Sequence, residues 1–155
     1  MACKLLRWLI IRRPSHFNPI LLLLFDQALP CYTLLLDKWF DGVPEYNDFF
    51  GTLFEWDIEE TQLRYGGDAR GLMDPRSLDY LESMGIKSIY IAGTPWLNMP
   101  WQADSYSALD FTLLDPHFGD LQDWIDLIDE MHRRNIYFIC DLTVGTMGDF
   151  MGFKG

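Results

Sequence analysis

Several features that mark common functional classes are missing from this 155-residue sequence. Its three cysteines, Cys3, Cys31 and Cys140, are odd in number and widely spaced, so they form neither a disulfide framework nor a zinc site. A glycine-rich phosphate loop is also missing, because Gly66-Gly67 lacks the spacing and the lysine of that motif. We therefore expect no cofactor and no metal ion.

Basic residues are scarce as well. The chain has 12 Lys and Arg against 23 Asp and Glu, a formal net charge of -11. The basic residues do not form a stripe along the sequence, so a nucleic-acid partner is not expected.

Long apolar runs are missing too. Ile20 to Phe25 is an apolar run of six residues that follows a basic stretch. It is shorter than the roughly 7 to 15 residues of a secretory signal and the roughly 18 of a membrane span. Residues 1–28 are therefore an atypical N-terminal segment with two open interpretations, a mispredicted start or a weak signal.

What is present is a strand–helix–strand unit in the second half of the chain. Residues 86–92 are β-branched and aromatic and end at Gly93-Thr94-Pro95, which predicts a strand. Asp120 is typical of an N-cap, and apolar residues then recur every three or four positions, as on one face of a helix: Leu121, Trp124, Ile125, Ile128 and Met131. Residues 136–140 form a continuous apolar run typical of a strand covered on both faces, and Asp141 follows at its carboxyl end.

Between the first of these strands and the helix lie about 27 residues, Gly93 to Gly119, far more than the two to six usual for such a loop. The segment is rich in rings, with Trp96, Trp101, Tyr106, Phe111 and Phe118. Two interpretations remain open: the rings form stacking platforms for sugars, or they only fold the loop over the rim. His117 lies in a turn before the helix and is interpreted as structural.

An earlier unit follows the same pattern. Residues 31–36 predict a strand that ends at Asp37, and Leu78, Leu81 and Met84 predict the apolar face of a helix stopped by Gly85. Asp74-Pro75 favours a helix that restarts at Pro75 with Asp74 as its N-cap. The alternative is one kinked helix continuing from Asp68.

Three motifs carry a family resemblance. Ser105 to Phe111, Leu114 to Asp120 and Cys140 to Val144 resemble the second βα unit and third strand of the α-amylase family, glycoside hydrolase family 13. A narrower resemblance is to the amylase-like domain of fungal cell-wall α-1,3-glucan synthases. It rests on Asp104 to Ser107, on the run 61–68 and on Thr146-Met147-Gly148-Asp149.

The resemblance implies an α/β fold, a partial TIM (β/α)8 barrel holding about the first three strands within residues 29–155. It also implies that Tyr106 stacks on a sugar and that Asp141 organises the catalytic centre, with Trp96 and Trp101 as weaker candidates for substrate binding. The family's catalytic carboxylates come from strands four, five and seven, so none is expected in this chain. Gly145 and Thr146 replace the family's calcium-binding asparagine and substrate-contacting histidine.

The expected function is therefore that of a fragment of an amylase-like domain in cell-wall α-glucan synthesis, inactive on its own. Its expected partner is an α-glucan or oligosaccharide, and contact with a membrane would come only through other parts of the parent protein. The parent family is located at the plasma membrane and cell wall. The alternative is a non-catalytic glucan-binding module or a nonfunctional fragment.

Overall fold

The computed structural model describes residues 30–46, 65–99 and 105–148. Its main sheet has three parallel strands, β1 (Cys31–Leu35), β2 (Ser88–Ala92) and β5 (Tyr137–Cys140), in the order β1-β2-β5. The three strands predicted from the sequence are confirmed. Successive parallel strands are joined through helices, as crossover connections require.

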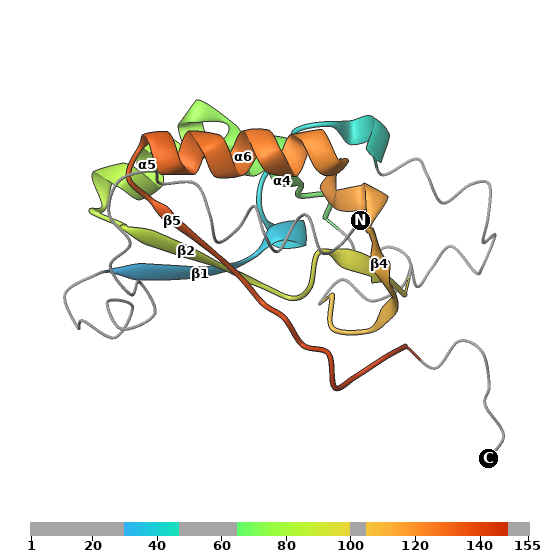
Figure 1. Cartoon of the computed structure of the whole chain (residues 1–155). Coiled ribbons are helices and arrows are strands. Elements are labelled where there is room, and N and C mark those ends of the chain that lie inside the picture. Colours follow the sequence, from blue (N-terminus) through green and yellow to red (C-terminus); the bar gives the residue numbers. More distant parts are fainter. Residues whose placement is uncertain (1–29, 47–64, 100–104, 149–155) are drawn as a thin grey trace, which may run out of the picture.

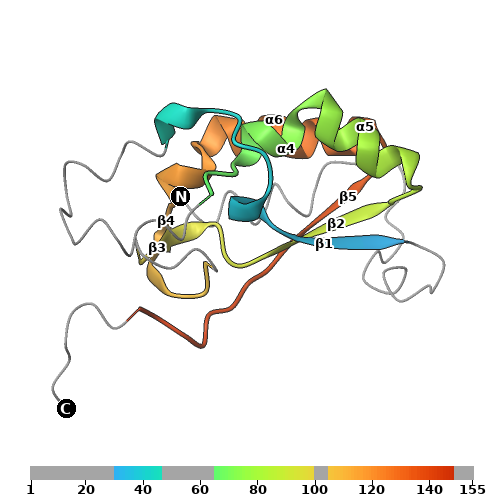
Figure 2. The same ribbon diagram turned by 180° about the vertical axis from the view of Figure 1, so that it is seen from behind.

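The three α-helices of the described residues lie on one face of this sheet (Figure 1). They are α4 (Ala69–Met73), α5 (Pro75–Ser83) and α6 (Leu121–Arg133). The view from behind shows the same two layers, with helices above and strands below (Figure 2). In the described part of the chain the opposite face of the sheet carries no helix. This one-sided cover is the architecture of one sector of a βα barrel.

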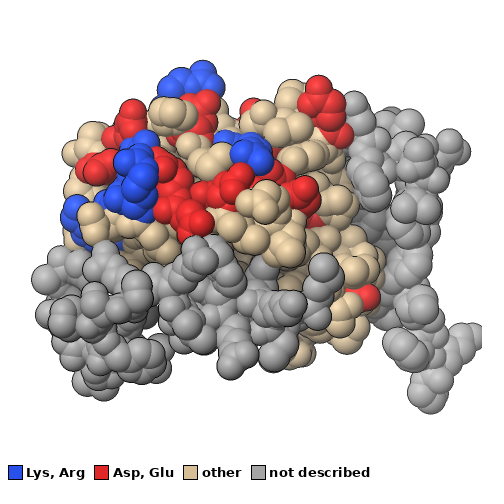
Figure 3. All heavy atoms as spheres, turned by 45° about the horizontal axis from the view of Figure 1, so that its top comes forward, with Lys and Arg blue, Asp and Glu red and all other residues tan. Residues whose placement is uncertain are grey.

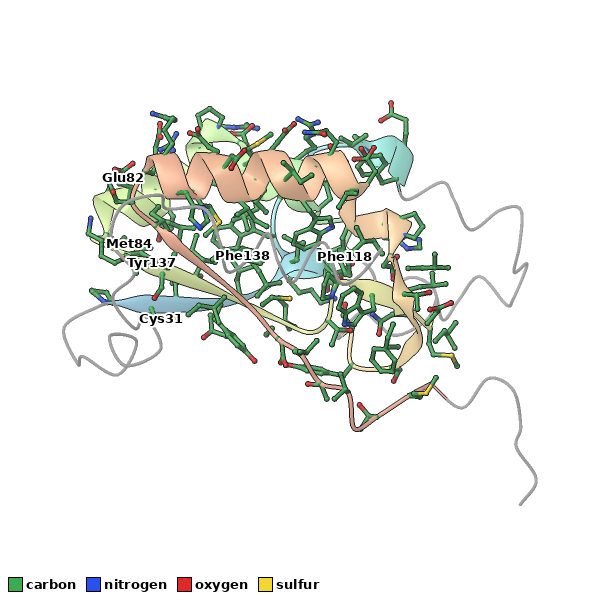
Figure 4. The ribbon with its side chains drawn as sticks, viewed as in Figure 1. Cys31, Glu82, Met84, Phe118, Tyr137 and Phe138 are labelled. Atoms are coloured by element: carbon green, nitrogen blue, oxygen red, sulfur yellow. The ribbon has the colours of Figure 1, made fainter. Side chains whose placement is uncertain are left out.

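The core lies between the helices and the sheet. Alternate residues of β2, Ile89 and Ile91, point into it and are 0% and 3% exposed. Phe138 of β5 packs against the same cluster beneath α6 (Figure 4). The other fully buried apolar side chains of this cluster come from the helices and the strand entrances: Ala69, Leu72, Leu78, Leu81, Leu127, Met131 and Ile136.

The predicted helix faces need two corrections. Leu121 and Met84 are 38% and 43% exposed, because Leu121 is the first residue of α6 and Met84 follows the end of α5. Leu127, which the predicted face of α6 omitted, is fully buried. It lies three residues after Trp124, so the buried stripe runs through Leu127 and leaves Ile125 half-buried.

The run 136–140 was predicted to form a strand covered on both faces, and this was wrong for the described strand β5, Tyr137–Cys140. All four of its residues are half-buried. The reason is that the described helices cover only one face of the sheet.

The predicted restart at Pro75 is confirmed. Asp74 separates α4 from α5, and its carboxylate accepts a hydrogen bond of 2.8 Å from the Arg76 amide. Pro75 occupies the first helical position, where its missing N–H costs nothing. Gly85 then has a φ of 75°, the left-handed conformation of a helix-ending residue.

The long segment between β2 and α6 is more regular than the sequence indicated. It contains an antiparallel pair, β3 (Trp96–Asn98) and β4 (Ala108–Leu114), and the short helix η3 (Pro116–Phe118). The pairing has two register shifts within three residues of β3. Such an irregular pair lacks the alternation by which strands are recognised in a sequence.

The segment after β1 is held by a buried carboxylate. Asp68 is 0% exposed and accepts hydrogen bonds from three backbone amides, those of Gly42 at 3.0 Å, Val43 at 2.8 Å and Gly71 at 2.7 Å. The same residue is the N-cap of α4. Asp68 therefore joins the chain that leaves η1 (Leu36–Lys38) to the start of the first crossover helix.

The outer surface of the helices mixes charges of both signs (Figure 3). Arg134, for example, lies between Asp79 and Glu82 of α5 and Glu130 of α6. Within the described ranges, no helix has the length and apolarity needed to cross a membrane. The atypical segment 1–28 lies outside the described residues.

Candidate functional site

The candidate site is built around Asp141, which follows the last residue of β5. The backbone amide of Asp141 still points toward the carbonyl of Ile91 in β2, at 3.4 Å, so the residue continues the parallel register. Its side chain is half-buried. Ligands of α/β proteins bind at this carboxyl edge of the strands.

Three hydroxyl groups donate hydrogen bonds to the Asp141 carboxylate. Tyr90 and Tyr106 both reach Oδ2, at 2.6 and 2.9 Å, and Thr143 reaches Oδ1 at 2.9 Å. The structure thus brings together Tyr106 and Asp141, two of the four residues expected to bind substrate. Tyr90 and Thr143 were missed by the sequence analysis.

These contacts keep the carboxylate ionised. Burial alone would raise the pKa of Asp141, but the hydrogen bonds from Tyr90, Thr143 and Tyr106 and from the Leu142 amide outweigh it and hold the pKa below 3.8. The pKa of the Tyr90 phenol is raised, chiefly because this hydroxyl donates to the carboxylate. Burial, more than this bond, raises the pKa of Tyr106. The site is a fixed negative charge surrounded by neutral hydroxyls.

The position of Tyr106 depends on the residue before it. Ser105 has a φ of 61°, which is uncommon for a side chain other than glycine, and it is buried. Its carbonyl accepts hydrogen bonds from the amide of Thr94 at 2.8 Å and from the hydroxyl of Thr94 at 3.0 Å. Thr94 therefore holds the turn that directs Tyr106 toward Asp141.

The chain that follows β5 returns to the backbone of Tyr106. The hydroxyl of Thr146 donates to the Tyr106 carbonyl at 3.2 Å, and the amide of Gly148 donates to the Ala108 carbonyl at 2.9 Å. A Cβ on Gly148 would lie 2.5 Å from the Met99 side chain, so only glycine fits there without movement. The Thr146-Met147-Gly148 motif thus closes one side of the site.

Residues 144–148 carry no carboxylate, amide or imidazole side chain. Gly145 has no side-chain donor where the amylase family has an amide, so these residues do not fit the calcium ion of that family. In the described ranges no group of three or more His, Cys, Asp or Glu residues is arranged to hold a metal ion.

The two tryptophan candidates are not brought to this carboxylate. Trp96 lies in β3 and is 5% exposed, so its ring is packed within the protein and offers little open face. Trp101 lies outside the described residues. The substrate-binding roles of Trp96 and Trp101 stay predictions.

His117 is part of the framework. Its ring nitrogen Nδ1 lies 2.5 Å from Oδ1 of Asp115, and both residues are buried. Asp115 also accepts a hydrogen bond from the amide of Asn98 in β3, at 3.2 Å. The pair fixes the β3–β4 sheet to η3, which agrees with the structural interpretation of His117.

The contacts of the Asp141 carboxylate do not supply a catalytic carboxyl pair within the described residues. Retaining glycoside hydrolysis needs two carboxyl groups about 5 to 5.5 Å apart. In the part of the chain that the structure describes, the side chains that donate to the Asp141 carboxylate all do so through hydroxyls. An ionised carboxylate beside a tyrosine ring is suited to orienting a sugar by hydrogen bonding and stacking.

Comparison with known proteins agrees with this architecture. Residues 37–154 match the family described as the catalytic domain of alpha amylase. The chain is 58% identical over 126 residues to the cell wall alpha-1,3-glucan synthase mok11 of Schizosaccharomyces pombe, a match that covers 81% of this chain. It spans about 5% of that relative's length.

Solved structures give the same fold. An Anoxybacillus α-amylase superposes with a TM-score of 0.65 at 28% identity, over 77% of this chain and 25% of the other. The α-amylase of Geobacillus thermoleovorans, complexed with acarbose, superposes with a TM-score of 0.62 at 26% identity. The match covers 79% of this chain and 24% of the Geobacillus chain. The predicted partial α-amylase barrel is therefore confirmed.

Proposed function

The chain belongs to the α-amylase family, and we propose that Tyr106 and Asp141 form one wall of a subsite for an α-glucan. The observation that carries the proposal is the 2.9 Å hydrogen bond between them. It joins an aromatic ring and an ionised carboxylate at the carboxyl edge of the parallel sheet. A glucosyl unit presents both a C–H-rich face for stacking and hydroxyls for the carboxylate.

We further propose that this segment acts within a protein of cell-wall α-glucan synthesis, located at the plasma membrane and cell wall. The support is the similarity to four cell wall alpha-1,3-glucan synthases of Schizosaccharomyces pombe, at 53% to 58% identity. In such a protein the segment would contribute glucan binding for processing or transglycosylation. Structural neighbours bound to acarbose and maltotriose support a carbohydrate ligand of this class.

The test is cosedimentation with insoluble α-1,3-glucan. Residues 29–155 are grafted in place of the matched region of mok11, so that the site is completed by the rest of a barrel. We expect the graft to bind α-1,3-glucan and to lose most of that binding in Asp141→Ala. Insoluble β-1,3-glucan is the ligand control, and Tyr80→Ala, an exposed tyrosine of α5, is the protein control.

The proposal would be contradicted if the graft and its Asp141→Ala variant cosedimented equally with α-1,3-glucan and had the same melting temperature. That result would favour a nonfunctional segment. If the graft cosedimented as strongly with β-1,3-glucan as with α-1,3-glucan, the assigned ligand class would be wrong.

A further inference from the structure

Among the side chains that donate to the Asp141 carboxylate, Tyr90 makes the shortest hydrogen bond, at 2.6 Å. It is the central residue of β2, between the buried Ile89 and Ile91. Because successive side chains of a strand point to opposite faces, Tyr90 lies on the face of the sheet that is opposite to the helices. In a closed barrel that face lines the interior.

The strand register explains how Tyr90 reaches the carboxylate. Tyr90 pairs directly with Thr33 of β1 and with Ile139 of β5. Asp141 lies two residues after Ile139, just past the end of β5, and continues the register, so it lies on the same face as Ile139. The long tyrosine side chain spans this diagonal, and its hydroxyl lies 2.6 Å from Oδ2 of Asp141.

The two tyrosines converge on one oxygen from different elements. Tyr90 comes from the rigid centre of the sheet, whereas Tyr106 comes from the irregular segment before β4. Both hydroxyls meet at Oδ2, while Thr143 holds Oδ1. A carboxylate held at both oxygens has lost its freedom to rotate about its terminal bond.

The number of donors leaves room for a ligand at this carboxylate. It accepts hydrogen bonds from three hydroxyls, and an ionised carboxylate offers about four lone-pair sites. About one site is therefore left for a sugar hydroxyl beside Tyr106. Tyr90 is held within the sheet, so it fixes the orientation of that remaining site.

We propose that Tyr90 is a positioning residue of the glucan subsite, which holds the Asp141 carboxylate in the orientation that receives Tyr106 and the sugar. The inference rests on the proposed function for its ligand, but the contact between Tyr90 and Asp141 is tested without one. Tyr90 does not touch the sugar in this assignment. It acts through Asp141.

The first experiment measures the carboxylate directly in the 155-residue chain. Carbon-13 NMR of labelled aspartate follows the titration of the Asp141 side chain, identified by the signal that disappears in Asp141→Asn. We expect the pKa of Asp141 to be higher in Tyr90→Phe than in the wild type, because a donor to the ionised form is lost. The neighbouring groups that also act on this titration are Tyr106 and Cys140, and both are unchanged.

The matched control is Tyr137→Phe. Tyr137 lies on the same face of the sheet, two residues before Ile139 in β5, and pairs in register with Ser88 rather than with Tyr90. Its loss of a hydroxyl should leave the Asp141 titration unchanged. An Asp141 pKa that is the same in wild type and Tyr90→Phe would overturn the proposal, whether or not glucan binds.

The second experiment measures binding in the mok11 graft by a double-mutant cycle. Tyr90→Phe should weaken binding to α-1,3-glucan about tenfold, the effect of one hydrogen bond to a charged group. In the Asp141→Asn background the same substitution should change binding by less than about twofold. An equal loss in both backgrounds would show that Tyr90 acts on the fold and not through Asp141.

Thr143→Val provides a second variant that does not alter the sheet. It removes the donor to Oδ1, the oxygen that Tyr106 does not use, so it should raise the pKa of Asp141 but weaken glucan binding less than Tyr90→Phe. If Thr143→Val weakened glucan binding more than Tyr90→Phe, Oδ2 would not be the oxygen that matters for the subsite. If the graft binds no glucan while the NMR result holds, the proposed function fails and the positioning contact stands.

Discussion

The hydroxyl of Tyr106 donates a hydrogen bond of 2.9 Å to Oδ2 of Asp141, although 35 positions separate the two residues in the sequence. The contact joins the irregular segment after β2 to the end of β5. Both residues are half-buried, so the ring and the carboxylate border the same partly open surface. The hydroxyl of Tyr106 contacts Asp141, while its ring is available for stacking. The two roles can therefore be tested separately, by removing the hydroxyl alone or the whole ring.

The first prediction concerns the Tyr106 ring. In the mok11 graft, Tyr106→Ala should weaken α-glucan binding by about 1 to 3 kcal/mol, because a stacking face is lost. Tyr106→Phe keeps the ring and should retain most of the binding. Isothermal titration with soluble α-glucan oligosaccharides measures both, and equal affinities for wild type and Tyr106→Ala would reduce Tyr106 to a residue of the loop framework.

The second prediction separates stability from binding. Trp124 of α6 is 3% exposed, and its ring meets that of Phe138 edge to face at a centroid distance of 6.0 Å. Trp124→Ala should lower the free energy of unfolding by about 3 to 5 kcal/mol. Urea denaturation measures the loss, and glucan affinity per folded molecule should stay unchanged.

A control for Trp124 is available on the same helix. Leu121 is 38% exposed at the start of α6, so Leu121→Ala should cost less than about 1 kcal/mol. Similar losses for the two variants would mean that α6 does not pack as described.

Local signals in the sequence were enough to predict the sheet and helix caps. The apolar runs gave all three parallel strands, and Asp120 and Asp123 form a reciprocal capping box at the start of α6. Each of these features depends on residues that lie within a few positions of one another in the sequence. Hydrophobic periodicity and capping residues are visible at that range, so they predict such features well.

The features that could not be predicted from the sequence depend on contacts between distant segments. The β3–β4 sheet is held by buried polar groups, Asn98 and Asp115 among them, which leave no periodic pattern in the sequence. Tyr90 was not recognised as a site residue because its contact with Asp141 requires the register of β2 against β5. Alternation could have placed Tyr90 on the correct face, but not its partner.

The third prediction concerns Asp68. Asp68→Ala would leave the partly buried amides of Gly42 and Val43 and the buried amide of Gly71 without this acceptor, so the free energy of unfolding should fall by about 3 kcal/mol or more. Asp74→Ala is the matched control, because Asp74 caps α5 at the surface and its loss should cost about 1 kcal/mol. Chemical denaturation of the two variants compares them, and an equal cost would contradict the central role of Asp68.

The last prediction concerns acid stability. Arg133 and Arg134 donate to the Glu130 carboxylate at 2.6 to 2.7 Å, and the hydrogen bonds from Arg133, with those from Arg134, lower the pKa of Glu130 from 4.5 to about 2. A carboxyl group whose pKa is lower in the folded state stabilises the fold above its unfolded pKa. That stabilisation is lost as the pH falls from about 4.5 through about 2.

Because Arg133 is largely exposed, solvent screens the pair, and we expect Glu130 to contribute about 1 kcal/mol. Urea denaturation at several pH values should therefore show a decline between pH 4.5 and 2 that is smaller by this amount in Glu130→Gln. Other carboxylates titrate in the same range, so only the difference between the two proteins is informative. Glu82→Gln, which removes a more exposed partner of Arg134 at 3.1 Å, should change the profile less. Parallel profiles for wild type and Glu130→Gln would show that these ion pairs do not stabilise the fold.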